Sequence, residues 1–395
     1  MGALTDIRVA DFTRVVSGPY CTMLLGDLAA EVIKVEEPDR GDDTRSWGPP
    51  FVGGESTYFL SVNRNKKSVC LDLRSDEGRA QARQIVLQSD IVVENFRPGV
   101  MDRLGLGYEA LSGIHPRLIY CAISGYGQEG PYRDRAGYDV VVQALGGLMG
   151  ITGTPDGPPV KTGVALIDLA AGLYAFSSIL AALYHRERTG QGQRLDVSLL
   201  SAQLATLINV ASAYLVAGAL PVPLGSAHAS IVPYQVFQAA DGYIMVGAAN
   251  DKLFSGLCAA LGHAEWAMDP RFSTNAARVH HRGQLLVLIE AVLRTATVAT
   301  WVERLAATQV AVAPVNTMDQ VFADPQVVHS QQVVTVAHPT AGDVKLVGPA
   351  VNYSLTPAEV MAPPPTLGQH TVEVLRELAG TRSVAGAPAL DNAPV

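Results

Sequence analysis

The first 200 residues alternate short apolar, β-branched segments with longer helical ones, and this alternation is the strongest constraint on the fold. Strands that alternate with helices in this way pair in parallel, in a sheet covered by helices on both faces. The sequence therefore predicts an α/β domain. The expected strands are Ile7–Phe12, Val32–Val35, Ser68–Leu73, Ile91–Glu94, Leu118–Ile123 and Arg194–Leu199, and the expected helices are Tyr20–Ala30, Asp76–Gln88, a segment after Gly137 and Asp168–Arg188.

A chain of 395 residues is long enough for two domains. The stretch Gly218–Gly225, rich in proline and glycine, is the best candidate boundary. A smaller α/β unit follows it, with strands expected at Tyr234–Phe237 and Gly242–Gly247, and it ends near Pro325. The tail resumes with strand-like segments and a final helix near Thr371–Leu378.

Composition excludes several classes of protein. Hydrophobic residues make up 48% of the chain and charged residues 17%, which is typical of a folded protein. The net charge of −8 argues against nucleic acid as a partner. Four scattered cysteines and the lack of a signal-peptide pattern indicate reduced thiols and a cytoplasmic location. The uncharged stretch Val197–Ala227 is interrupted by polar residues, so we expect a buried or interface helix there and no membrane contact.

One carboxylate, Asp168, stands alone at the start of the long apolar segment Leu169–Tyr184. A helix start is electropositive, so a carboxylate there is expected to stay ionised and fixed in direction, as a nucleophile requires. The alternative is that Asp168 only caps the helix, a role that aspartate fills often. On this segment alone, the cap is the favoured interpretation.

Several nucleotide and hydrolase signatures are missing. The chain contains no G-x-x-x-x-G-K-[ST] loop, no G-x-G-x-x-G after the first strand, no G-x-S-x-G and no H-E-x-x-H. Cations and an asparagine instead lie in turns next to the predicted strands. Arg64–Lys67 precedes the strand Ser68–Leu73, and Asn95–Arg103 follows the strand Ile91–Glu94. Since ligands of open α/β sheets bind beyond the carboxyl ends of the strands, these turns favour a polyanionic ligand with amide groups, such as a nucleotide-capped thiol carrier.

Further motifs occur in collinear order along most of the chain. They are Asp11–Pro19, Gly26–Glu36, Gly41–Arg45, Asn63–Ser68, Val93–Phe96, Ile123–Gly127, Ala136–Asp139, Thr189–Gly192 and Leu367–His370. Together they resemble the family III CoA-transferases, the superfamily of formyl-CoA transferase, carnitine CoA-transferase and α-methylacyl-CoA racemase. The stretches Arg45–Gly53, Glu55–Tyr58, His228–Gln235, Val321–His329 and Pro363–Thr371 are most similar to the succinyl-CoA:dicarboxylate (succinate–hydroxymethylglutarate or glutarate) branch.

The resemblance implies a Rossmann-like domain formed by residues 1–217 and 326–395, a small domain over 218–325, and a homodimer of two interlocked rings. It makes Asp168 the catalytic carboxylate, with a CoA thioester as substrate and with no metal or permanently bound cofactor. The partners are then an acyl-CoA and a carboxylic acid. The implied CoA contacts are Val16, Ser17, Leu71, Arg74, Asn95, Phe96, Arg97, Arg103, Tyr138 and Asp139.

The sequence also departs from the family. Glu37 stands where relatives have an arginine, and Arg40 is the expected substitute. Arg135 or His228 is a candidate to bind a distal carboxylate of the substrate. Racemases of the family carry a histidine where this chain has Tyr138, and tyrosine, with a pKa near ~10, is a poor base at neutral pH.

The favoured function is therefore CoA transfer between acids, with succinyl-CoA as donor, through an aspartyl anhydride and an aspartyl-CoA thioester. Backbone N–H groups at the start of the Asp168 helix are expected to stabilise the oxyanions. An acyl-CoA racemase or epimerase and a non-catalytic acyl-CoA-binding homologue remain as alternatives.

Overall fold

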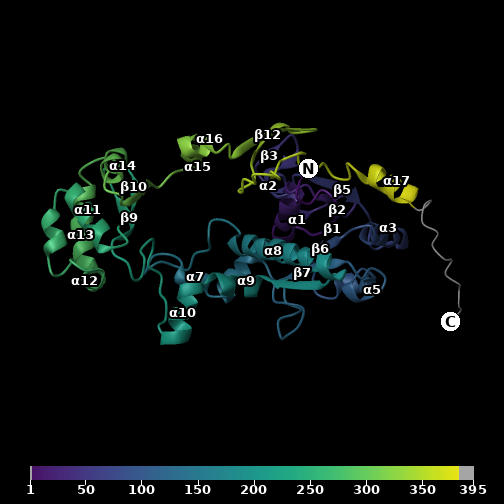
Figure 1. Ribbon diagram of the computed structural model, residues 1–395, viewed down its shortest axis with the longest axis horizontal. Coiled ribbons are helices and arrows are strands. Elements are labelled where there is room, and N and C mark those ends of the chain that lie inside the picture. Colours follow the sequence, from purple (N-terminus) through teal and green to yellow (C-terminus); the bar gives the residue numbers. More distant parts are fainter. Residues whose placement is uncertain (1, 382–395) are drawn as a thin grey trace. The chain divides into compact units, whose positions relative to one another are not determined.

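The computed structural model describes residues 2–381, and the chain divides into two compact units (Figure 1). The large unit comprises Met1–Gly146, Thr162–Ser212 and Val328–Val395, and the small unit comprises Gly147–Lys161 and Ala213–Val327. The small unit thus takes in residues 147–161, which the range expected from the sequence leaves out. One contact that ties this segment to the small unit is a 2.7 Å hydrogen bond from the Gly225 N–H to the Gly153 carbonyl.

A six-stranded parallel sheet in the order β5-β2-β1-β6-β7-β8 forms the centre of the large unit. This order matches the doubly wound nucleotide-binding sheet. From β1, successive strands are added first toward one edge of the sheet (β2, β5) and then toward the other (β6, β7, β8), so the order of strands reverses between β1 and β6. The predicted α/β class and all six predicted strands are confirmed. The strands are β1 (Arg8–Phe12), β2 (Glu31–Glu36), β5 (Lys66–Cys70), β6 (Ile91–Glu94), β7 (Ile119–Ser124) and β8 (Arg194–Ser198).

Helices cover both faces of the sheet, and the side chains of its strands are therefore buried on both sides. Alternate strand residues such as Phe12 and Val92 pack in one hydrophobic core with α3 (Asp76–Leu87), α5 (Tyr108–Ser112) and α17 (Thr371–Thr381). The helices α1 (Ser17–Asp27) and α8 (Leu166–Thr189) pack against each other and against strands β1, β6, β7 and β8. The C-terminal α17 also contacts β5 and α3, so residues distant in sequence complete this unit.

Helix α8 has the length and mean hydropathy of a membrane span, yet it packs against α1 and strands β7 and β8. The segment Val197–Ala227, expected to be a buried or interface helix, forms two helices instead of one. The structure has α9 (Leu199–Thr206) and α10 (Ile208–Ala217), bent by 78° to each other, and none of the α10 residues is buried in this chain. Two further helices, α13 (Arg282–Leu293) and α14 (Val298–Ala306), form a second bent apolar pair.

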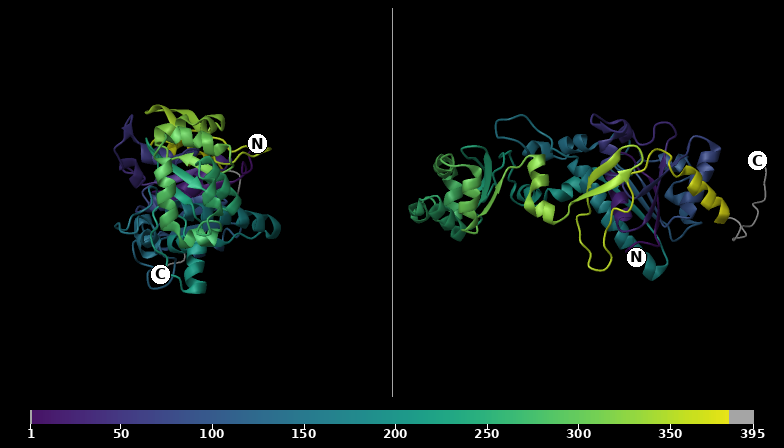
Figure 2. Two further views of the ribbon diagram at one scale, coloured as in Figure 1. Left: turned by 90° about the vertical axis from the view of Figure 1, so that its left-hand side faces the viewer. Right: turned by 90° about the horizontal axis from the view of Figure 1, so that it is seen from above.

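The small unit has its own core around an antiparallel three-stranded sheet, β9 (Tyr234–Gln238), β10 (Tyr243–Gly247) and β11 (Ala311–Pro314). Helices α11 (Asp251–Ala260), α13 and α14 lie beside these strands (Figure 2). Their apolar residues share one core with the strands. The remaining helices and strands of the two units together are η1 (Asp43–Ser46), β3 (Phe51–Val52), β4 (Glu55–Ser56), α2 (Thr57–Ser61), α4 (Val100–Arg103), α6 (Asp139–Leu145), α7 (Leu148–Ile151), η2 (Ala264–Met268), α12 (Asn275–His280), α15 (Met318–Ala323), α16 (Pro325–His329), β12 (Val333–His338) and β13 (Gly342–Val347).

Candidate active site

Two pockets of the large unit open beyond the carboxyl ends of its strands, around the β1–β6 switch point where ligands of such sheets bind. They share Arg14 and Phe96. The first, here called the carboxylate pocket, is lined by Arg14, Val15, Ser17, Asp43, Ser46, Trp47, Asn95, Phe96, Arg97, Ile123, Ser124, Gly125, Gly137, Tyr138, Asp168 and Leu199. Six of the residues expected from the sequence therefore meet in it: Ser17, Asn95, Phe96, Arg97, Tyr138 and Asp168.

A close approach of two glycines brings Tyr138 and Asp139 to this pocket. A Cβ atom on Gly125, just beyond β7, would lie 2.6 Å from the Cα of Gly137, and a Cβ on Gly137 would lie 2.4 Å from the Cα of Gly125. Any side chain at either position would push apart the two backbones. The segment that leads into α6 is therefore fixed against the end of β7.

Asp168 lies inside the first turn of α8, two residues after its first residue, Leu166. The expectation that it caps the helix is wrong. The N-cap position belongs to Ala165, and the capping oxygen comes from Asp139, whose Oδ1 accepts hydrogen bonds from the N–H groups of Ile167 (2.7 Å) and Asp168 (3.2 Å). Those two N–H groups are consequently not available to stabilise an oxyanion, contrary to expectation.

The Asp168 side chain is 9% exposed, and within residues 2–381 its carboxylate has no hydrogen-bond donor and no ion-pair partner. Burial raises its pKa, and the neighbouring carboxylate of Asp139 raises it further, to about 7. The expectation of a firmly ionised carboxylate therefore fails, because Asp139 occupies the electropositive N–H groups and adds a like charge. Such a poorly solvated carboxylate is a strong nucleophile once it is ionised.

Buried charges hold the loop between β1 and α1, which forms one wall of the pocket. Lys34 on β2, fully buried, donates to the carbonyl of Thr13 (2.7 Å) and to Asp42 (2.9 Å). Asp42 in turn accepts from the N–H of Val15, whose backbone φ is +68°. Sequence reasoning missed this group, although a lysine in the middle of an apolar strand was a visible signal.

Below the same loop, Asp11 accepts from the N–H and hydroxyl of Thr13 (2.9 and 2.5 Å), and from Lys66 (3.1 Å). Burial opposes ionisation of Asp11, but Lys66 and Lys34 outweigh it and lower its pKa to about 2. Burial lowers the pKa of Lys66 to about 8 against the opposing effect of Asp11. The loop therefore rests on a set of buried charges that pair with one another.

Asn95 has a different role from the one expected. Its side chain accepts from the N–H of Arg14 and donates to the carbonyl of Arg14, both at 2.8 Å. It therefore joins the turn after β6 to the loop after β1 and has little capacity left for a ligand amide.

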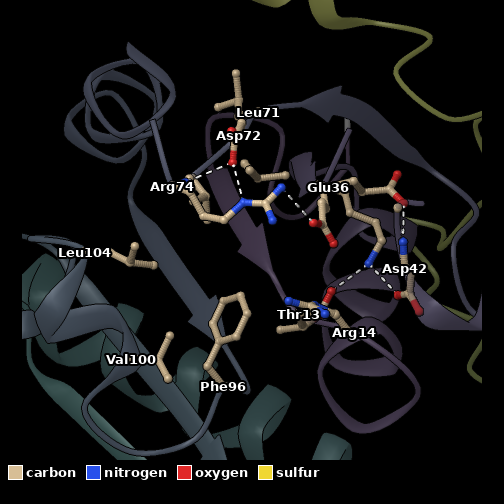
Figure 3. Close-up of a pocket in the computed structure, with 15 residues that line it drawn as sticks. Thr13, Arg14, Glu36, Asp42, Leu71, Asp72, Arg74, Phe96, Val100 and Leu104 are labelled. Carbon is tan, nitrogen blue, oxygen red and sulfur yellow. Dashed lines mark hydrogen bonds and ion pairs between the residues drawn. The ribbon is translucent and has the colours of Figure 1, made fainter. Parts of the chain in front are cut away.

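The second pocket, here called the strand-end pocket, contains Leu71 and Arg74 after β5, with Phe96, Val100 and Leu104 on its apolar side (Figure 3). Arg74 is 78% exposed and pairs with Asp72 (3.0 Å) and with Glu37 (3.2 Å). Glu37, the residue that replaces an arginine of the family, thus lies against the cation expected to meet a phosphate. An anionic ligand at Arg74 would lie next to the Glu37 carboxylate.

Five other predicted residues lie elsewhere or have other roles. Val16 is buried at the N-cap of α1, next to the pocket residues Val15 and Ser17. Arg40, Arg103 and Arg135 are exposed and line neither pocket, and Arg135 stacks on the ring of Tyr132. His228 belongs to the small unit, where its ring packs edge-on against Tyr234. The structure therefore gives no support to Arg135 as a ligand of the carboxylate pocket.

The described residues contain no group of three or more His, Cys, Asp or Glu side chains placed to hold a metal ion. All four cysteines are free thiols, with Cys21, Cys121 and Cys258 buried and Cys70 partly exposed.

Comparison with known proteins gives one consistent result. The model of CoA-transferase family III matches residues 4–371. The chain is 46% identical over 375 residues to a human protein named succinyl-CoA:glutarate CoA-transferase, an alignment that covers 95% of this chain and 86% of the human one. It is 43% identical over 386 residues to a succinate–glutarate CoA-transferase of Agrobacterium fabrum, with 95% of each chain covered.

Solved structures agree with the sequence relatives. A CAIB/BAIF family protein from Brucella suis superposes with a TM-score of 0.86 at 40% identity, covering 95% of this chain and 99% of that protein. Similarity over the whole of both chains extends the relationship from the sheet to the small unit.

Proposed function

Because the chain belongs to CoA-transferase family III, we propose that it moves CoA from succinyl-CoA to a second dicarboxylic acid, with Asp168 as the covalent carrier. The observation that carries this proposal is the buried Asp168 carboxylate, which has no donor of its own within the described chain and lines a pocket at the switch point. The names of the relatives support the choice of succinyl-CoA and of a dicarboxylate such as glutarate.

In the first step, a carboxylate oxygen of Asp168 attacks the thioester carbonyl carbon of the donor. An O–C bond forms, the C–S bond breaks, and CoA leaves as its thiolate, which gives a mixed anhydride between Asp168 and the succinyl group. The thiolate then attacks the aspartyl carbonyl carbon, releases succinate and leaves CoA bound to Asp168 as a thioester.

In the second half of the reaction, the same steps run in reverse order with the acceptor acid in place of succinate. A carboxylate of the acceptor acid attacks the aspartyl thioester, CoA thiolate departs, and a second anhydride forms. The thiolate attacks the acceptor-derived carbonyl carbon, which produces the new acyl-CoA and returns Asp168 as a free carboxylate. No net proton transfer is required, so the site needs no general base beside Asp168.

Oxyanion stabilisation falls to groups outside α8 in this proposal. The first N–H groups of any helix lack intrahelical partners, and the first residue of α1, Ser17, lines the carboxylate pocket with Asp168. The buried charges beneath the β1–α1 loop keep that turn rigid, which preorganises its donors.

The residues around Asp168 disfavour racemase chemistry. Among the described residues that line the carboxylate pocket, none is a histidine, and Tyr138 occupies the position at which family racemases carry one. A racemase needs a base that removes the α-proton at neutral pH, and a phenol is a poorer base for that step than an imidazole.

A panel of acids tests the proposal. The purified protein is mixed with succinyl-CoA and, separately, glutarate, hydroxymethylglutarate, malate, itaconate or acetate, and new acyl-CoA is followed by mass spectrometry. We expect transfer to at least one dicarboxylate, little transfer to acetate, and loss of transfer in Asp168→Ala. Exchange of α-deuterium into an acyl-CoA without any acceptor acid would instead identify a racemase, and binding of CoA with no transfer to any acid would identify a non-catalytic homologue.

A further inference from the structure

Behind the Asp168–Asp139 pair lies a buried glutamine that the proposed chemistry does not use. Gln143 on α6 is fully buried. Its Nε2 donates to Asp139 Oδ2 (2.5 Å) and to the hydroxyl of Thr162 (3.0 Å), and its Oε1 accepts from the N–H of Thr162 (3.0 Å). The amide is satisfied on both sides, so its orientation is fixed.

These bonds connect three segments of the large unit. Gln143 lies one turn after Asp139 on α6, and Thr162 belongs to the segment that leads into α8. The other oxygen of Asp139 accepts the N–H groups of Ile167 and Asp168. The chain of contacts therefore runs from Thr162 through Gln143 and Asp139 to the backbone of Asp168 itself.

We propose that Gln143 is a positioning residue, which holds the Asp139 carboxylate on the first turn of α8 and so keeps a like charge beside Asp168. This inference rests on the proposed function, because it concerns the loading of Asp168 with an acyl group or with CoA. Gln143 itself touches no reacting atom and acts only through Asp139.

The benefit of the arrangement follows from charge. Free Asp168 and Asp139 repel each other when both are ionised, whereas Asp168 in an anhydride or thioester is neutral. The repulsion therefore raises the free energy of the unloaded enzyme relative to the loaded one. Each oxygen of Asp139 accepts a hydrogen bond, and the bond from Gln143 to Oδ2 fixes this carboxylate beside Asp168.

Other charged or titratable side chains line the same pocket as Asp168. Arg14, Arg97 and Asp43 line the carboxylate pocket, as does the phenol of Tyr138. Tyr58 on α2 is 38% exposed, and its pKa is raised by the burial of the rest of the side chain and then by the charges of Asp168 and Asp139. Its phenol therefore lies in the field of both carboxylates. Of these groups, only Asp139 contributes to the raised pKa of Asp168.

The test compares single-turnover loading of Asp168 in four variants. Gln143→Leu removes the donor, Thr162→Val removes only the hydroxyl that orients it, and Asp139→Asn removes the neighbouring charge. Gln81→Leu is the matched control, since Gln81 on α3 donates to Glu77, four residues earlier, in the same way but outside both pockets. Loading by succinyl-CoA is quenched in acid and measured on the Asp168 peptide between about pH 5.5 and 8.5.

For the wild type, loading rises with pH through about 7, as Asp168 ionises. We expect Gln143→Leu to slow loading at least about tenfold and to move this rise at least about half a pH unit lower, with the KM for succinyl-CoA changed less than about threefold. Thr162→Val is expected to shift the pH dependence of loading in the same direction, but by a smaller amount. It provides the measurement if Gln143→Leu does not fold. Gln81→Leu behaves as the wild type.

A double-mutant cycle decides whether Gln143 acts through Asp139. If it does, Gln143→Leu has little further effect on loading once Asp139→Asn is present. Equal effects of Gln143→Leu in both backgrounds, or an unchanged pH profile, would overturn the inference while leaving the proposed function intact. Absence of any adduct on wild-type Asp168 would instead overturn the proposed function, and the inference with it.

Discussion

At the scale of single residues, the site centres on a carboxylate that is costly to ionise. The pKa of Asp168 is about 7, compared with an ordinary value of 3.8, because the side chain is buried and faces Asp139. The folded state therefore binds the Asp168 proton more tightly than the unfolded state does. The stability that this proton confers is complete below about pH 4 and is lost as the pH rises through 7.

We therefore expect Asp168→Asn to stabilise the protein while it abolishes transfer. The gain in the free energy of unfolding over the wild type should grow by up to about 4 kcal/mol between pH 4 and pH 8, because the asparagine side chain never carries the buried charge. Urea unfolding at about pH 4 and about pH 8 measures it. The control is Asp134→Asn, a change at an exposed aspartate. A gain that does not grow with pH would contradict this account of Asp168.

The position of Asp168 could be predicted from the sequence, but its environment could not. Local rules favoured a cap, because aspartate at a helix start often serves as one, and the family resemblance then indicated a catalytic carboxylate. The actual cap is Asp139, which lies 29 residues earlier. No local pattern reveals a contact at that separation.

At the scale of elements, the β1–α1 loop depends on charges buried in the strands beneath it. The strands themselves could be predicted, because apolar segments between turn signals mark them well. Lys34 was missed, since a charge within a strand usually indicates a solvated face. Lys66 was assigned to a ligand-binding turn, but it is buried and donates to Asp11. The ends of β1 and β6 define the pocket, and that follows from the sheet order.

Lys34→Met tests the importance of this network. Removing one partner of a buried pair leaves Asp42 and the Thr13 carbonyl without their donor, which should cost about 3–5 kcal/mol of stability. Lys67→Met on β5 is the control, since Lys67 pairs with Glu31 and Glu373 at the surface and should cost less than about 1 kcal/mol. Equal losses in denaturant unfolding would show that the loop does not depend on Lys34.

At the scale of the whole molecule, several large apolar side chains on α8 and α9 are exposed to solvent in the single chain. Leu173, Tyr174 and Tyr184 on α8 and Leu204 on α9 are between 43% and 66% exposed. Exposed apolar surface of this kind marks an interface. Together with the family resemblance, it supports our proposal of a homodimer in which these helices meet a second copy.

Light scattering coupled to gel filtration tests the assembly. We expect a mass of twice that of one chain, with no monomer at micromolar concentration. Leu173→Glu and Leu204→Glu place charges on the proposed interface and should shift the population toward monomer, whereas Met268→Glu, at a residue 82% exposed in the small unit, should not. A wild-type monomer would contradict the proposed dimer.

The most direct test of the central claim is chemical trapping of the carrier residue. The protein is incubated with succinyl-CoA alone and then treated with borohydride, which reduces an aspartyl thioester to the alcohol of homoserine. Peptide mapping should locate homoserine at position 168, with no other aspartate or glutamate reduced and with no such product from Asp168→Ala. Reduction at a different residue, or none at Asp168 in a preparation that transfers CoA, would contradict the account.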